Sequence, residues 1–99
     1  MIGTPAMTFT ATTRFSQHPD ALATEVGSVI VILHTQTGMF HQLNPVGSYL
    51  WSQLAEPIEF NALEEKAASF FDADPAVCAR DIVDFLRALD AQGLVVIEA

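Results

Sequence analysis

The chain has 99 residues, a length that accommodates one small hydrophobic core and leaves no room for a second. Hydrophobic residues make up 51% of it and charged residues 16%, which excludes a disordered tail, because disorder requires low hydrophobicity and dense charge. The formal net charge of −8 repels phosphate backbones and anionic lipids alike, so neither nucleic acid nor a membrane is an expected partner.

The first half of the chain predicts a small antiparallel sheet. Residues 1–20 are rich in Thr, Ala and Pro and show no sustained periodicity, so we expect a flexible N-terminal arm ahead of one folded domain over residues 21–99. A short strand is expected at 22–25, and a β-branched aliphatic run predicts a second strand at 29–34. A four-residue loop then leads to a third strand at 39–43. Short connections make this a meander whose last strand lies at an edge.

The second half predicts three helices. An Asn-Pro pair opens a helix expected over 45–54 and an Asp-Pro pair opens the longest one, over 75–92, because Asn and Asp are preferred N-caps and Pro suits the first helical position. Between them an amphipathic pattern predicts a helix over 60–71. The tail at 94–97 is β-like and predicts a final short strand or wing. The expected fold class is α+β and winged helix-turn-helix-like.

Helical spacing also predicts which side chains are buried. Trp51 is expected in the core, together with Leu63, Ala67, Phe70 and Phe71 on the second helix. On the longest helix we expect one apolar stripe formed by Cys78, Ile82, Phe85, Leu86 and Leu89. Asp81 borders this stripe, where it can meet a polar group of any molecule that lies along the helix.

No pattern in the sequence is typical of a metal or catalytic site. His34 and His41 are expected on one face of the predicted hairpin, but no CxxC, HExxH or carboxylate cluster completes a zinc site, and two half-exposed histidines are the simpler interpretation. Cys78 lies on the apolar stripe, where a thiol behaves as a small hydrophobe. There is no GxSxG elbow, phosphate loop or paired-carboxylate pattern. We expect no metal, no cofactor and no enzymatic activity.

The single cysteine cannot form an internal disulfide, and this favours a reducing compartment. The longest strictly aliphatic run, residues 29–33, is far shorter than the roughly 20 residues of a membrane span. The first 20 residues lack the basic start and apolar stretch of an export signal. We therefore expect a cytoplasmic protein.

The strand at residues 39–43 is an unprotected edge. Edge strands present unpaired N–H and C=O groups, which proteins usually blunt with Lys, Pro, a bulge or a covering segment. None of these residues is charged or a proline. Two interpretations stay open: either the N-terminal arm or the tail at 94–97 covers the edge, or a peptide adds to it as a further strand.

One segment and the helix pattern after it resemble a known family. The segment reads TGMFHQLNPVG at residues 37–47 and is followed by Trp51, and the later matches are Phe85-Leu86, Leu89 and Gly93-Leu94. Over roughly residues 14–97 the chain resembles the PqqD-like family, the recognition elements of ribosomally synthesised and post-translationally modified peptides (RiPPs), which include stand-alone members of lasso-peptide pathways. His41 departs from the family, which often has an aromatic residue such as Tyr there.

The resemblance implies a non-catalytic protein that binds the leader of a precursor peptide and presents it to a maturation enzyme, such as a leader peptidase or a radical enzyme. We expect the leader to pair with the edge strand and to place alternate side chains in a trough beside the helix at 75–92. The expected peptide-binding residues are Met39, Phe40, His41, Gln42, Leu43, Cys78, Asp81, Ile82 and Phe85. Of these, Phe40, Cys78, Ile82 and Phe85 are expected to form its pockets. A lasso-peptide pathway is favoured, with a pyrroloquinoline quinone precursor chaperone as the alternative.

Two functions of other classes remain as rivals. A winged-helix regulator would read DNA with the helix at 75–92, but that helix carries two arginines against three aspartates and lacks the cationic surface that phosphate contacts require. A purely structural subunit would close a dimer by strand pairing at the exposed edge, and its mark would be self-association without a peptide.

Overall fold

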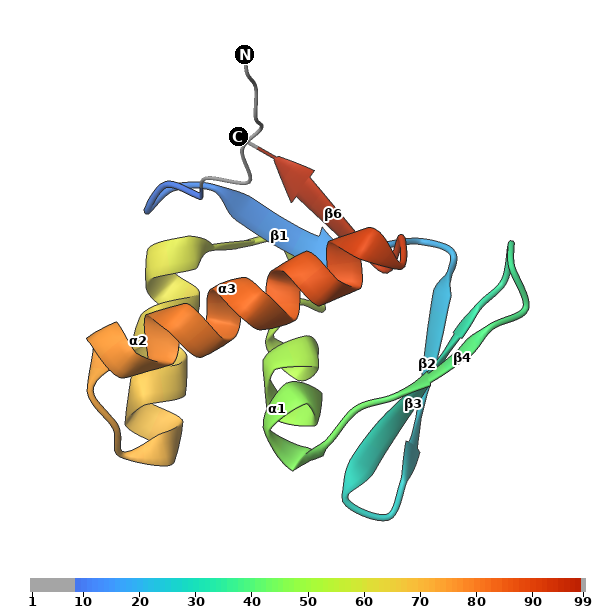
Figure 1. Cartoon of the computed structure of the whole chain (residues 1–99), viewed down its shortest axis with the longest axis horizontal. Coiled ribbons are helices and arrows are strands. Elements are labelled where there is room, and N and C mark those ends of the chain that lie inside the picture. Colours follow the sequence, from blue (N-terminus) through green and yellow to red (C-terminus); the bar gives the residue numbers. More distant parts are fainter. Residues whose placement is uncertain (1–8, 99) are drawn as a thin grey trace.

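Two three-stranded sheets and three helices make up the fold in the computed structural model, which describes residues 9–98 (Figure 1). In chain order the elements are β1 (Arg14–Gln17), β2 (Ala21–Val26), β3 (Val29–His34), β4 (Phe40–Gln42), α1 (Pro45–Gln53), β5 (Ile58–Glu59), α2 (Phe60–Phe71), α3 (Pro75–Ala91) and β6 (Val95–Glu98). This order confirms the expected α+β, winged helix-turn-helix-like fold class, with a meander, three helices and a C-terminal strand.

The sheet β2-β3-β4 is the expected antiparallel meander, with β3 in the centre. Its register pairs Leu33 with Leu22 on one side and with Phe40 on the other. Because side chains alternate along a strand, Ile32 points to the interior, where it is fully buried, and Leu33 lies on the outer face. Figure 1 shows the meander extending away from the helices, with α1 as the helix nearest to it.

The second sheet corrects the expectation for the N-terminal arm. Residues 14–17 form β1, which lies between β5 and β6 and pairs antiparallel with both. Phe15 anchors the strand, because it is fully buried and its ring forms a T-shaped pair with that of Phe9 at a centroid distance of 4.9 Å. The strand leaves no local pattern in the sequence because both partners lie far along the chain. Residues 1–8 of the expected arm lie outside the described residues.

The helices begin where the capping signals place them. The side chain of Asn44 accepts the N–H of Gly47 at 2.7 Å, and that of Asp74 accepts the N–H of Ala76 at 2.8 Å. The second helix has its expected bounds, and the first and third each end one residue earlier than expected.

The core lies between the helices and the inner faces of the sheets. Its largest fully buried side chains are Trp51, Phe15, Ile32, Leu54, Leu63, Ile82, Leu86 and Leu94. Trp51 is thus in the core as expected. Phe70 is not, because it is 61% exposed and its ring stacks on the half-buried Tyr49 at a centroid distance of 3.8 Å. Leu63 and Ala67 are buried on α2 as expected, and Phe71 is half-buried.

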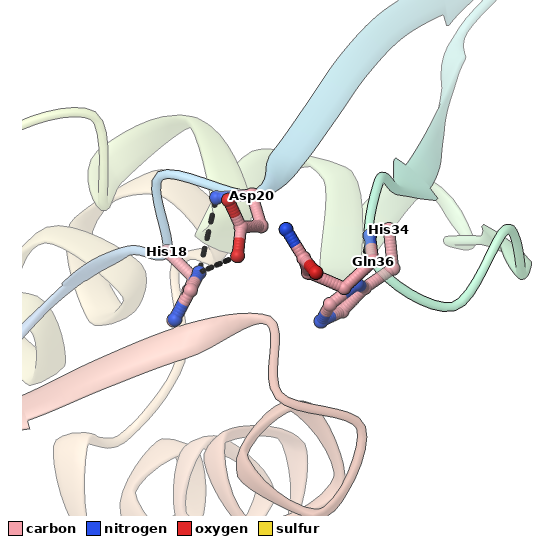
Figure 2. A network of polar contacts seen from close by, with 4 residues as sticks. All are labelled: His18, Asp20, His34 and Gln36. Atoms are coloured by element: carbon pink, nitrogen blue, oxygen red, sulfur yellow. Dashed lines mark hydrogen bonds and ion pairs between the residues drawn. The ribbon is translucent and has the colours of Figure 1, made fainter.

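The turn between β1 and β2 joins the two sheets, and Figure 2 shows its polar side chains. His18 Nδ1 accepts the N–H of Asp20 at 3.0 Å, and the N–H of His18 donates to the carbonyl of Leu94 at 3.0 Å. The N–H of Thr35 donates to the carbonyl of Asp20 at 2.8 Å. The turn therefore holds the end of β3 beside the start of β6.

Gly93, between α3 and β6, is required by this junction for two reasons. Its φ of +71° lies in the left-handed region, which favours glycine. A Cβ at this position would lie 3.2 Å from Nε2 of the buried His34. The ring of His34 in turn stacks on that of His18, with 6.1 Å between the ring centroids. The site has no room for a side chain unless the imidazole moves.

We expect Gly93→Ala to lower the free energy of unfolding by about 1–2 kcal/mol for the left-handed backbone alone, and by more because the methyl group crowds His34. Gly27→Ala is the matched control, since its φ is +67° and nothing lies within 4 Å of the added Cβ. Urea unfolding of both variants separates the two contributions. Equal losses would mean that the contact with His34 contributes nothing.

Candidate functional site

The free edge of β4 is the first component of the candidate site. Within residues 9–98, β4 pairs with β3 and with no other strand. The tail at 94–97, one of the two segments proposed as a cover, pairs with β1 instead. In the other proposed cover, the N-terminal arm at 1–20, residues 14–17 pair with β5 and β6 as well, and residues 1–8 lie outside the described part of the chain.

Alternate residues of β4 direct their backbone groups to this edge. The carbonyl of Met39 accepts an N–H from β3 at 2.9 Å, and the N–H of Leu43 donates to a carbonyl of β3 at 2.9 Å. In an antiparallel ladder, residues bonded to one neighbouring strand alternate with residues whose N–H and C=O point the other way. Phe40 and Gln42 therefore each present one N–H and one C=O to the open edge.

The side chains of β4 divide between the two faces of the meander. His41 lies opposite the buried Ile32 on the inner face and is half-buried. Phe40 lies opposite Leu33 on the outer face and is 68% exposed. The expectation that Phe40 fills a pocket beside the third helix is therefore wrong, because the register directs its side chain to the opposite face.

Two adjoining hollows form the second component, between the start of α1 and the middle of α3. One is lined by Asn44, Val46, Gly47, Leu50, Asp81 and Phe85. The other is lined by Val46, Leu50, Ala67, Phe71, Cys78, Asp81 and Ile82. Because Val46, Leu50 and Asp81 line both, we describe the two hollows together as the trough. It starts at Asn44, directly beyond the C-terminal end of β4.

The wall of the trough depends on a close approach of α1 and α3. A Cβ on Gly47 would lie 3.1 Å from Cε1 of Phe85 and 3.2 Å from Oδ1 of Asn44. Phe85 is half-buried, so its ring both packs on α1 and lines the trough. Glycine at position 47 thus lets the two helices approach closely enough for one aromatic ring to close the gap.

The trough is apolar except for the carboxylate of Asp81 and the side chain of Asn44, whose Oδ1 accepts the N–H of Gly47. Asp81, which is exposed, is the only charged side chain among the lining residues. Cys78 and Ile82 are buried in the wall, with 8% and 1% of their surface exposed. The trough therefore suits apolar side chains, together with one group that donates a hydrogen bond to Asp81.

The structure brings together one part of the predicted site and adds to it. Cys78, Asp81, Ile82 and Phe85 meet in the trough, and residues 39–43 lie along the edge that leads to it. Sequence reasoning missed the lining residues Asn44, Val46, Gly47, Leu50, Ala67 and Phe71. The available signal was the shared helical face of Val46 and Leu50, which is indistinguishable in sequence from a face that is buried in the core.

The histidines do not form a second site with other possible ligands. The ring of His34 stacks on that of His18 at a centroid distance of 6.1 Å, and Figure 2 shows both side chains. Among the residues that the structure describes, no group of three or more His, Cys, Asp or Glu side chains could hold a metal ion. None of the helices in this part of the chain has the length and apolar character needed to span a bilayer.

The hydroxyl of Ser48 replaces the last direct hydrogen bond between β3 and β4. The N–H of Ile30 donates to Ser48 Oγ at 2.8 Å, and the hydroxyl donates to the carbonyl of Leu43 at 3.5 Å. In a regular ladder the N–H of Ile30 would donate to that carbonyl directly. Ser48 is buried, so this hydroxyl fastens α1 to both strands where the trough begins.

We expect Ser48→Ala to lower the free energy of unfolding by about 1–3 kcal/mol, because it leaves the N–H of Ile30 without its partner. Ser52→Ala is the control on the same helix, since its exposed hydroxyl donates to the carbonyl of Tyr49 at 2.6 Å and accepts from the exposed side chain of Gln53 at 3.3 Å. This control should change stability by no more than about 0.5 kcal/mol. Identical urea midpoints for the two variants would contradict the role assigned to Ser48.

Comparisons with known proteins match this chain to one family model and to two solved structures. The model of a family described as coenzyme PQQ synthesis protein D (PqqD) matches residues 30–95. The chain is similar to the solved structure of TbiB1 in complex with the TbiA(beta) leader peptide, with 30% identity, a TM-score of 0.76, and coverage of 81% of this chain and 93% of that chain. It also shares its fold with a lasso peptide synthetase B1 complexed with the leader peptide, at 18% identity, a TM-score of 0.73, and coverage of 83% and 96%. No curated protein matches it.

Proposed function

Because the chain belongs to the PqqD family, we propose that it is a non-catalytic recognition protein that binds the leader of a RiPP precursor and presents it to a maturation enzyme. The leader-peptide complex of the 30% identical TbiB1 supports a leader as the ligand. The likeness to a lasso peptide synthetase B1 favours a lasso-peptide pathway over pyrroloquinoline quinone synthesis.

The observation that carries this proposal is a free strand edge that leads into an apolar trough. A leader in extended form adds to β4 as a further strand and bonds to the outward N–H and C=O of Phe40 and Gln42. Beyond Gln42 it reaches Asn44 and the trough, where its side chains contact Phe85. The edge thus sets the direction of the leader, and the trough selects its sequence.

Magnitudes show why the edge alone is insufficient. Each hydrogen bond to the four outward backbone groups contributes about 1 kcal/mol of net free energy. Association itself costs roughly 4–15 kcal/mol in lost translational and rotational freedom. Apolar side chains in the trough supply the difference at roughly 25 cal/mol per Å² of buried surface. We therefore propose that affinity depends chiefly on the wall formed by Cys78, Ile82 and Phe85, with Asp81 accepting a hydrogen bond from the leader.

The first test titrates the protein with the leader half of the precursor encoded beside its gene. We expect saturable binding with a dissociation constant that is micromolar or lower, measured by the fluorescence anisotropy of a labelled leader. Gln42→Pro removes an N–H that faces the open edge and leaves the bonds to β3 in place, so it should weaken binding at least tenfold.

Ala23→Pro is the matched control for this test, because it removes an outward N–H from β2, at the opposite edge of the meander. It should leave the affinity unchanged. If Ala23→Pro abolished binding while Gln42→Pro did not, the leader would pair with β2 and the proposed edge would be wrong. Absence of binding to the wild-type chain would count against the function itself.

The second test empties the trough. Phe85→Ala removes a half-buried ring from its wall, and we expect at least a tenfold loss of leader affinity with cooperative unfolding retained. Val77→Ala on the same helix removes a side chain that is 63% exposed and lies outside the trough, and it should change the affinity less than twofold. Calorimetric titration of both variants measures the difference, and equal affinities would mean that the trough holds no part of the leader.

A further inference from the structure

Asp81 is the charged residue that both hollows of the trough share. It is exposed, and within residues 9–98 its carboxylate has neither an ion pair nor a hydrogen bond with another side chain. No Lys or Arg is among the described residues that line the trough. The carboxylate therefore depends on water for its stabilisation.

Helical spacing separates Asp81 from the two arginines of α3. Side chains three or four positions apart are neighbours on the surface of a helix. Arg80 and Arg87 stand at these spacings from Asp84. The residues at the same spacings from Asp81 are Val77, Cys78, Asp84 and Phe85. The helix thus supplies Asp84 with two cationic neighbours and Asp81 with none, so a cation for Asp81 has to come from a ligand.

Binding changes the surroundings of this carboxylate, because a peptide that fills both hollows covers Asp81. Removal of a carboxylate from water is strongly unfavourable unless a partner compensates for the lost hydration. A neutral donor such as a hydroxyl restores one hydrogen bond but leaves a net negative charge among apolar side chains. A cation restores the hydrogen bond, strengthens it and neutralises the charge. The trough therefore discriminates against a leader that brings apolar side chains alone.

We propose that Asp81 selects a leader that carries Lys or Arg between the apolar side chains that occupy the two hollows. The inference rests on the proposed function and specifies the chemistry of its ligand. Both basic residues suit the trough, since each has an apolar stem that packs on a wall residue such as Phe85 while its charged head reaches the exposed carboxylate. Asp81 is thus a specificity-determining residue, and the apolar wall supplies the area that holds the peptide.

The charge of the whole chain acts in the same direction. Its formal net charge is −8, from 12 acidic and 4 basic residues. Such a field attracts a basic peptide from a distance and raises its association rate. This general attraction does not depend on any single position, whereas the contact with Asp81 does. Variants that remove one carboxylate at different places separate the two effects, because they change the net charge equally.

The experiment titrates the full chain and its variants with the leader half of the precursor encoded beside its gene, by calorimetry. We expect Asp81→Asn to bind the leader at least tenfold more weakly than wild type, with cooperative unfolding retained because the residue is exposed. Asp84→Asn is the matched control, since it makes the same change in net charge at an exposed residue of α3 that does not line the trough. It should change the affinity less than twofold.

A second set of leaders, in which each Lys or Arg is replaced in turn by Gln, identifies the residue that Asp81 holds. One of these leaders should bind wild type at least tenfold more weakly, yet bind Asp81→Asn as well as the unsubstituted leader does, because the two changes remove the same contact. Asp81→Lys should regain at least tenfold in affinity when that basic residue of the leader is replaced by Glu.

Four outcomes would overturn the inference. Equal losses in Asp81→Asn and Asp84→Asn would reduce the effect to net charge. Coupling of Asp81 to a Ser, Thr or Tyr of the leader would make the ligand group a neutral donor, and tight binding of a leader without Lys or Arg would remove the need for a cation. These three leave the leader function intact, whereas failure of the wild-type chain to bind any leader would overturn the proposed function as well.

Discussion

The buried hydroxyl of Ser48 connects the meander to the helices, and the position of the candidate site depends on that connection. It accepts a hydrogen bond from the N–H of Ile30 and donates one to the carbonyl of Leu43, so the last pair of the ladder between β3 and β4 is connected through α1. From α1 the constraint passes to α3 through the close approach of Gly47 and Phe85. The C-terminal end of β4 and the wall formed by α3, which are distant in sequence, are thereby connected through α1.

Local signals were sufficient for most of the fold. The Asx-Pro pairs before α1 and α3 act through hydrogen bonds within three residues, and the aliphatic run of β3 reflects burial of one strand, so both can be read from short windows. The strand β1 could not be predicted in this way. Its partners β5 and β6 come from other parts of the chain, and its main anchor is the single side chain of Phe15.

The candidate site was predictable to the extent that it follows from chain order and charge. The last strand of a meander is an edge, and residues 39–43 lack the charges that usually protect one. The face on which Phe40 lies was not predictable, because a shift of one residue in register exchanges the two faces. Val46 and Leu50 were not predicted as lining residues for a related reason: helical periodicity identifies an apolar face but does not reveal whether protein or solvent lies against it.

Cys78 gives the trough a property that its packing role does not require. It is the only cysteine in the sequence, it is not bonded to another residue as a disulfide, and it lies in the wall with 8% of its surface exposed. A peptide seated in the trough shields this sulfur from water-soluble alkylating reagents. The rate of thiol modification therefore reports occupancy of the trough without any label on either molecule.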